Sequence, residues 1–176
     1  LQNIADAQHA NGAVPTTAPE YVVFEGPGMD AFAESPEWGC TFVVLPFMYY
    51  ETYGDDSLIR KYYNGMRRYI DYMTTRANDG IVSFGLGDWY DYGDFRAGFS
   101  RNTPVPLVAT AHYYMVVRYL VEAARMLDNR YDVAYYTHLG EEINKAFHRE
   151  FYHKDTRQYG TGSQCSNALP LFLGMV

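Results

Sequence analysis

The residues best suited to chemistry gather in one segment, FGLGDWYDYGDFRAGF (residues 84–99). Gly85, Gly87 and Gly93 bend its backbone too often for a helix or a long strand. Aromatic and charged side chains alternate along the segment, and the rings are Trp89, Tyr90, Tyr92, Phe95 and Phe99. Such a loop suits a polyhydroxylated ligand, because the C–H faces of a sugar stack on rings while its hydroxyl groups bond to carboxylates. The segment therefore predicts a sugar-binding loop.

Trp38 and Trp89 are the only tryptophans of the chain. A glycine lies close to each of them in sequence, Gly39 and Gly87, and a residue without a side chain lets a ligand approach the backbone. We expect both indoles to stack on a sugar and Asp88 to orient the sugar hydroxyl groups. The alternative is that both indoles are anchors of the core.

Hydrolysis of a glycosidic bond needs two carboxyl groups, roughly 5–5.5 Å apart for retention or roughly 6.5–9.5 Å apart for inversion. The carboxylates expected near the loop are Glu20, Glu25, Asp30, Glu34, Glu37, Asp88, Asp91 and Asp94. We expect most of them to lie at helix starts or to face solvent. Asp88 is singled out for binding, and no residue of the chain is assigned as the catalytic acid or base.

His112 lies early in an expected apolar helix. It is predicted either to contact the sugar or, as the more common arrangement, to bond to a backbone carbonyl group in the core. Cys40 and Cys165 lie in apolar sequence without metal-ligand spacing, so we expect buried thiols and no metal site. The sequence has no phosphate-binding, dinucleotide-binding or zinc-protease motif, and no cofactor is expected.

The charge of the chain excludes some classes of partner. A net charge of −7 and a pI near 5.1 do not fit a nucleic-acid binder, and no polybasic patch or long apolar run predicts contact with a membrane. The chain begins with Leu1 and shows no signal peptide, so we expect an interior piece of a longer protein. A periplasmic, an extracellular and a cytoplasmic location are all compatible with this sequence.

Hydrophobic periodicity predicts helices of two kinds that alternate along the chain. Apolar helices are expected over residues 35–53 and 103–127 and from residue 163 onward, and amphipathic helices over residues 55–77 and 133–151. Ser35 and Asp132 are the expected N-caps, and Gly54 is an expected helix end. The helix over residues 35–53 is apolar all round, so it should be buried on every side.

The connections alternate as well. Short turns lead from apolar to amphipathic helices, whereas the return connections, residues 78–102 and 152–162, are long. An inner ring of apolar helices within an outer ring has this pattern, so we expect an all-α fold of antiparallel helical hairpins. All long loops then lie at the end where the inner helices begin, which we call the rim. An α-solenoid is the alternative, although the hairpins share no repeated motif.

Five segments carry a family resemblance. They are DAQHANGAVPTTAPEY (residues 6–21), SPEWGCTFVVLPFMYYETYGD (35–55), GLGDWYDYG (85–93), NTPVPLVATA (102–111) and YGTGSQCSNALPLFLGMV (159–176). Through these segments nearly the whole chain resembles the catalytic domain of bacterial α-L-rhamnosidases of glycoside hydrolase family 78. The resemblance implies about half of an (α/α)6 barrel, with residues 1–176 as a fragment of one catalytic domain. It also implies inversion at the anomeric carbon, no redox or organic cofactor, and a rhamnose pocket lined by Trp38 and Trp89 with Asp88 beside it.

The chain departs from the family pattern at two places. Cys40 stands where an aspartate often follows Trp-Gly. The resemblance also implies a general acid before the DAQ segment and a general base after the TGSQ segment, both outside this chain. We therefore expect the full-length protein to hydrolyse terminal α-L-rhamnosides, to which the chain supplies part of the sugar pocket. The isolated chain should be inactive and should self-associate through uncovered apolar faces.

Three other functions stay open at this point. The chain could be a non-catalytic carbohydrate-binding module, part of an (α/α)6 glycosidase acting on another sugar, or a helical scaffold whose aromatic loop docks a partner. Hydrolysis by the full-length protein separates the first from the leading prediction, and a lack of sugar affinity would favour the last.

Overall fold

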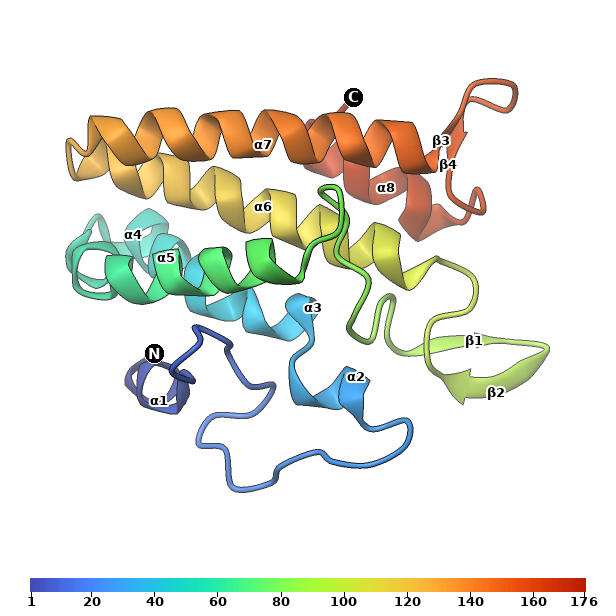
Figure 1. Ribbon diagram of the computed structural model, residues 1–176, viewed down its shortest axis with the longest axis horizontal. Coiled ribbons are helices and arrows are strands. Elements are labelled where there is room, and N and C mark those ends of the chain that lie inside the picture. Colours follow the sequence, from blue (N-terminus) through green and yellow to red (C-terminus); the bar gives the residue numbers. More distant parts are fainter.

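A computed structural model describes residues 1–176 and is mainly helical (Figure 1). The helices are α1 (Gln2–Ala7), α2 (Asp30–Ala33), α3 (Pro36–Gly39), α4 (Thr41–Tyr53), α5 (Ser57–Arg76), α6 (Val105–Met126), α7 (Arg130–Phe151) and α8 (Gln164–Phe172). Two antiparallel hairpins join β1 (Asp91–Gly93) to β2 (Phe95–Gly98) and β3 (Tyr152–His153) to β4 (Gln158–Tyr159). None of the helices combines the length and the apolar character that a membrane crossing requires.

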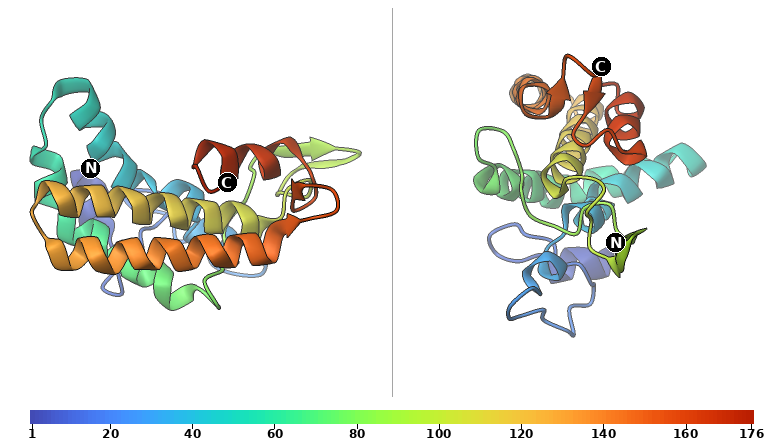
Figure 2. Two further views of the ribbon diagram at one scale, coloured as in Figure 1. Left: turned by 90° about the horizontal axis from the view of Figure 1, so that it is seen from above. Right: turned by 90° about the vertical axis from the view of Figure 1, so that its right-hand side faces the viewer.

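The long helices pack on the two sides of α6. Apolar α4 and α8 lie on one side of apolar α6, and amphipathic α5 and α7 lie on its other side (Figure 2). α6 contacts α3, α4, α5, α7 and α8. The predicted alternation of apolar and amphipathic helices is confirmed: α4 with α5 and α6 with α7 are complete hairpins, and α8 is a third inner helix.

Hydrophobic periodicity in α5 correctly predicts its buried face. The predicted residues are all buried: Ile59, Tyr62, Met66, Tyr69, Ile70 and Met73. They belong to one apolar core that extends from α4 through α5 and α6 to α7. A smaller cluster around Leu107, Phe147 and Tyr159 joins α6 and α7 to the β3–β4 hairpin.

Two tyrosine–aspartate hydrogen bonds join the outer helices α5 and α7. The Tyr63 hydroxyl donates to Asp132 Oδ2 over 2.6 Å, and the Tyr136 hydroxyl donates to Asp71 Oδ1 over 2.9 Å. Burial, with a further contribution from the neighbouring aspartate, raises the pKa of each phenol well above its ordinary value. Both phenols therefore remain protonated and able to donate at neutral pH.

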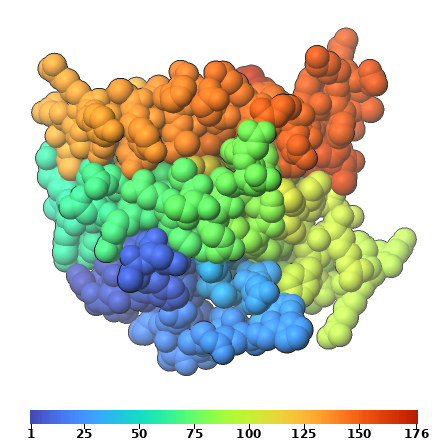
Figure 3. All heavy atoms as spheres, viewed as in Figure 1, coloured from blue at the N-terminus to red at the C-terminus, as the bar shows by residue number.

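The long connections lie at the end of the molecule where α6 and α8 begin (right in Figure 1). The β1–β2 hairpin projects from this end in the space-filling view (Figure 3). Thr103 and Ser163 precede α6 and α8, and their Oγ1 and Oγ atoms are 2.7 Å apart. The chain thus has the rim that the alternating loop lengths predict.

The prediction that the helix over residues 35–53 is buried on every side is wrong, and part of α8 is exposed as well. Met48 of α4 is 55% exposed and Phe172 of α8 is 82% exposed. The physical reason is that no other helix of this chain covers the inner face. The helix expected over residues 35–53 is also divided into α3 and α4 at Cys40, although Cys40 keeps helical dihedral angles (φ −56°, ψ −22°).

The predicted start of α7 is also corrected. Asn129 is its N-cap, because Asn129 Oδ1 accepts the N–H of Asp132 over 3.1 Å, and Asp132 therefore lies in the first turn. Gly54 ends α4 as predicted, with a left-handed φ of 69°. The sequence pattern does not predict α1, α2 or the β1–β2 hairpin, since each is too short to show a period.

Candidate functional site

An open depression of about 880 Å³ lies on the rim, between the loop that precedes α6 and the start of α8. Its lining is largely polar and includes Asp88, Asn102, Thr103, Thr161, Ser163 and Cys165. Hydroxyl, amide and carboxylate groups that converge in a depression of this kind are suited to a small ligand rich in hydroxyl groups.

Helix starts place the hydroxyl groups of the depression. Ser163 is the N-cap of α8, and its Oγ accepts the N–H of Ser166 over 3.1 Å. Thr103 Oγ1 lies 2.7 Å from Ser163 Oγ and 3.4 Å from Asp88 Oδ2. Thr103 therefore connects the start of α8 with the loop that carries Asp88.

Asp91 fixes one end of that loop. Its carboxylate accepts the backbone N–H groups of Asn102 (2.7 Å), Arg101 (2.6 Å) and Tyr92 (2.9 Å), and the Asn102 side-chain amide (2.5 Å). These hydrogen bonds, those of the Asn102 and Arg101 N–H groups first, hold the pKa of Asp91 below its ordinary value. A carboxylate that is ionised and engaged in this way is suited to holding the base of the hairpin.

The other end of the loop is held by residues at the start of α3. Leu86 N–H donates to Ser35 Oγ over 3.0 Å, and Gly87 N–H donates to Glu37 Oε1 over 3.1 Å. Gly85 allows this close approach, because a Cβ atom there would lie 2.7 Å from both Glu37 Oε2 and Pro36 Cδ. Residues 86–91 therefore cross the rim with both ends attached.

Asp88 lies between these two anchored points and faces the depression. Its contact with Thr103 Oγ1 is long, at 3.4 Å, so its oxygens are less engaged than those of Asp91. Burial is the main cause that raises the pKa of the Cys165 thiol to about 11, and the charge of Asp88 adds to it. Asp88 is accordingly the carboxylate of the depression best placed to accept a hydrogen bond from a ligand.

The two tryptophans lie in different surroundings. Trp89 packs edge-on against Phe32, with ring centroids 5.4 Å apart, and against Phe99, at 5.5 Å. Trp38 is 38% exposed and lines a separate cavity of about 310 Å³ together with Val14 and Pro15. The structure therefore places Trp38 and Asp88 on different cavities, while Trp89 belongs to an aromatic cluster beside the loop.

His112 Nδ1 lies 2.8 Å from the carbonyl oxygen of Val108, one turn earlier in α6. This contact matches the alternative in which the imidazole bonds to a backbone carbonyl group. Cys40 is buried, as predicted, and burial raises its pKa to about 12. Cys165 is half-buried and lines the depression, contrary to the expectation that both thiols are buried. Neither thiol is ionised at neutral pH, so neither is suited to act as a nucleophile.

The carboxylates that line the depression are Asp88 and Asp91, and Asp91 is fully occupied by N–H groups. Since glycoside hydrolysis requires a pair of working carboxyl groups, the depression by itself can orient a hydroxylated ligand but lacks the pair. No group of three or more His, Cys, Asp and Glu side chains has an arrangement that could hold a metal ion.

Sequence reasoning predicts Asp88 for this site and misses Asn102, Thr103 and Ser163. A signal for the last two was present, because Thr103 precedes Pro104 and Ser163 precedes an apolar helix. Residues at the starts of the inner helices are expected on the rim, and Ser163 is the N-cap of α8 while Thr103 directly precedes the N-cap of α6, Pro104. Nothing in the sequence identifies Asn102, whose role depends on the β1–β2 hairpin.

Comparison with known proteins gives a match over the whole chain. Residues 1–176 match the family described as the bacterial alpha-L-rhamnosidase 6 hairpin glycosidase domain. A curated alpha-L-rhamnosidase of Formosa agariphila is 23% identical over 172 residues, which are 97% of this chain and 18% of the relative.

Two solved structures have the same fold. The alpha-L-rhamnosidase of Dictyoglumus thermophilum superposes with a TM-score of 0.85 at 27% identity, over 99% of this chain and 19% of that protein. The Streptomyces avermitilis alpha-L-rhamnosidase complexed with L-rhamnose gives a TM-score of 0.82 at 24% identity, over 99% of this chain and 16% of that protein. The chain spans less than a fifth of the length of each of these relatives.

Proposed function

This chain belongs to the family of bacterial α-L-rhamnosidase six-hairpin glycosidase domains, and we propose that the full-length protein hydrolyses terminal α-L-rhamnosides with inversion at the anomeric carbon. The observation that carries this proposal is the family match over all of residues 1–176. A rim depression lined by hydroxyl, amide and carboxylate groups supports a sugar as the ligand.

We propose further that residues 1–176 are part of one (α/α)6-barrel catalytic domain. Two complete hairpins and a third inner helix make up about half of six hairpins. The exposed apolar side chains on α4 and α8 support this proposal, because they form a face that further helices of the same domain would cover. The general acid and the general base then come from other parts of the full-length protein.

In this proposal Asp88 accepts hydrogen bonds from the hydroxyl groups of rhamnose, next to Thr103 and Ser163. Rhamnose is a deoxyhexose, so it also carries a methyl group that suits an aromatic surface. We propose that Trp89, a residue of the loop itself, offers such a surface, although its ring does not line the depression. Trp38 and His112 are proposed as weaker contacts, because Trp38 lines a separate cavity and His112 is bonded to the backbone.

The test uses the full-length protein and p-nitrophenyl α-L-rhamnopyranoside. We expect release of p-nitrophenol, with the β-anomer of rhamnose as the first product seen by proton NMR. Replacement Asp88→Ala should lower kcat/KM about 10- to 100-fold, since a hydrogen bond to a charged group contributes about 1.5–3 kcal/mol. Asp94→Ala is the matched control, because Asp94 is exposed at the turn of the neighbouring β1–β2 hairpin, outside the depression, and should leave kcat/KM unchanged.

The outcomes separate the alternatives. Binding of rhamnose without turnover would indicate a carbohydrate-binding protein, and turnover of a different aryl glycoside would indicate a glycosidase for another sugar. Turnover of the aryl rhamnoside by the 176-residue chain alone would contradict the placement of the acid and the base outside it.

We also propose that the 176-residue chain alone self-associates through the apolar face of α4 and α8. Met48, Leu171 and Phe172 are exposed there. Sedimentation velocity should show association that depends on protein concentration. A stable monomer throughout the concentration range would contradict this proposal.

A further inference from the structure

Glu37 links the start of α3 to the loop that carries Asp88. Its Oε1 atom accepts the N–H of Gly87, the residue directly before Asp88, over 3.1 Å. Its other oxygen, Oε2, accepts a hydrogen bond from the Ser35 hydroxyl. Ser35 Oγ in turn accepts the N–H of Leu86 over 3.0 Å. Two successive N–H groups of the loop are therefore held by a single connected pair of side chains.

This pair fixes the backbone immediately before Asp88. Asp91 fixes it three residues later, through the N–H groups of Arg101 and Asn102. Only residues 88–90 lie between the two attachments. Hydrogen bonds to a carboxylate are stronger than those between neutral groups, so both attachments are firm.

Glu37 does not itself line the depression, and both of its oxygens are occupied within the chain. It is therefore not suited to contact a ligand there or to transfer a proton. What it can determine is where the Asp88 carboxylate lies relative to Thr103 and Ser163. A displacement of about 1 Å at such a group is enough to weaken recognition greatly.

We propose that Glu37 is a positioning residue for substrate binding: through Gly87 and Ser35 it holds the Asp88 loop in its binding position. This inference rests on the proposed function, since it takes the sugar to bind at Asp88. Loss of Glu37 should therefore weaken sugar binding, although the side chain never touches the sugar.

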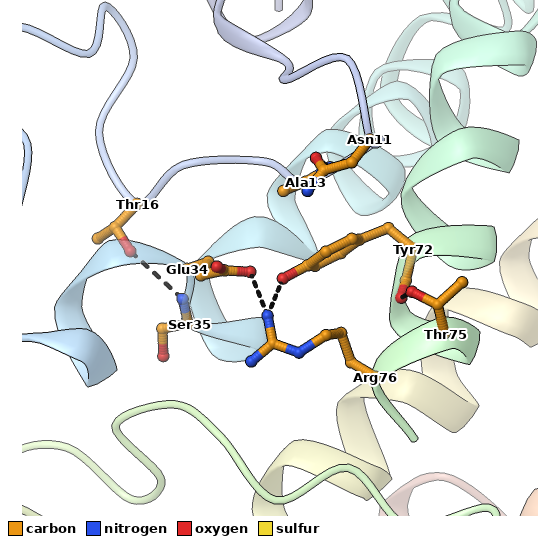
Figure 4. Close-up of polar contacts among 8 residues, drawn as sticks. All are labelled: Asn11, Ala13, Thr16, Glu34, Ser35, Tyr72, Thr75 and Arg76. Atoms are coloured by element: carbon orange, nitrogen blue, oxygen red, sulfur yellow. Dashed lines mark hydrogen bonds and ion pairs between the residues drawn. The ribbon is translucent and has the colours of Figure 1, made fainter. Parts of the chain in front are cut away.

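Glu34 provides a matched control three residues earlier. Its carboxylate pairs with Arg76 over 3.2 Å, and Arg76 also bonds to the Tyr72 hydroxyl (Figure 4). In the same view the Ser35 side chain points away from this pair. Glu34→Ala therefore removes a carboxylate of the same region without disturbing the attachment of the loop.

The experiment compares Glu37→Ala, Glu37→Gln and Glu34→Ala in the full-length protein. KM for the aryl rhamnoside and Ki for L-rhamnose should rise about 10- to 100-fold in Glu37→Ala, as expected for the loss of hydrogen bonds to a charged group. Glu37→Gln should recover much of the affinity, because the amide oxygen still accepts the Gly87 N–H. Glu34→Ala should leave both constants unchanged.

Amide hydrogen exchange gives a readout that does not depend on activity. Leu86 and Gly87 should lose protection in Glu37→Ala and keep it in Glu34→Ala. Unchanged protection of these two amides in Glu37→Ala would overturn the proposal, and so would an unchanged Ki. An inactive wild-type protein would instead overturn the proposed function, and the exchange of Leu86 and Gly87 would still decide whether Glu37 holds the loop.

Discussion

The helical hairpins and the rim loop are ordered by different forces. In the hairpins, α5, α6 and α7 bury aliphatic and aromatic side chains in one continuous core. On the rim, residues 86–91 are held mainly because Glu37 and Asp91 accept backbone N–H groups. Apolar burial resists any change of volume, whereas hydrogen bonds to the main chain fix only the path of the backbone.

This contrast separates stability from recognition. A substitution in the hairpins should lower the free energy of unfolding of the helices. The rim loop should then lose its order only when the helices unfold. A change at the rim attachments should free the loop while the helices remain folded. Each substitution below is chosen to break one of these two kinds of order.

The largest effect is expected from Ile70→Ala in α5. Ile70 is fully buried, so its truncation leaves a cavity and should cost about 2–5 kcal/mol of stability. Amide exchange across α5, α6 and α7 in the full-length protein measures this loss. Asn64→Ala, at an exposed position of the same outer helix, is the control and should stay within about 0.5 kcal/mol. Equal losses for the two variants would contradict a continuous core.

A smaller loss is expected from Tyr63→Phe, which removes the hydrogen bond to buried Asp132. Because the acceptor is charged, the expected loss is about 1.5–3 kcal/mol. Tyr62→Phe is the matched control, since the Tyr62 hydroxyl bonds to the neutral side chain of Gln2 and should cost about 0.5–1.5 kcal/mol. The same exchange measurement applies, and a reversed order of the two losses would refute the role of Asp132.

The smallest effect on global stability is expected from Asp91→Asn, which should act on the rim alone. Asp91 Oδ2 accepts the N–H groups of Arg101 and Asn102, and Oδ1 accepts that of Tyr92. An amide keeps an acceptor at one end only, and that acceptor is neutral, so the summed protection of these three amides should fall while that of α5 is unchanged. Loss of protection in α5 as well would show that the two regions are not independent.

Lowering the pH should have the same effect on the rim amides of the wild-type protein as the Asp91→Asn substitution. The folded pKa of Asp91 lies below its unfolded value, because the N–H groups of Asn102 and Arg101 bond to the ionised form. Its contribution is therefore present above the unfolded pKa, about 3.9, and is lost as the pH falls through the lower folded value. Rim amides should lose their protection in that range in the wild-type protein, and Asp91→Asn should lack this pH dependence.

The sequence predicts the hairpins well and the rim poorly, because local patterns encode helices but not contacts between residues far apart in the chain. The burial of Ile59, Met66 and Met73 follows from a local period of the sequence, and Gly54 marks its helix end directly. The attachment of Gly87 to Glu37 joins residues 50 positions apart, and no local pattern encodes it. In the sequence Asp91 is likewise one of several acidic residues of the loop, although in the structure it is the one whose carboxylate holds the base of the hairpin.

The exposure of the inner helices shows a second limit of prediction from the sequence. The apolar sequence of α4 predicts burial, yet Met48 is exposed because burial depends on what lies opposite, not only on the helix itself. Asp88 is placed on the rim as its sequence context predicts. The separation of the Trp38 cavity from the depression becomes evident only once the path of residues 8–20 is known.

The attachments of the loop act mainly on the main-chain N–H groups of Leu86, Gly87, Arg101 and Asn102, so they do not depend on the side chains of Asp88 and Tyr90. Asp88 and Tyr90 can therefore be substituted without refolding the structure beneath them, whereas Trp89 is held by its packing against Phe32 and Phe99. Substitutions at those two positions, natural or engineered, can therefore change the ligand specificity with little loss of folding stability.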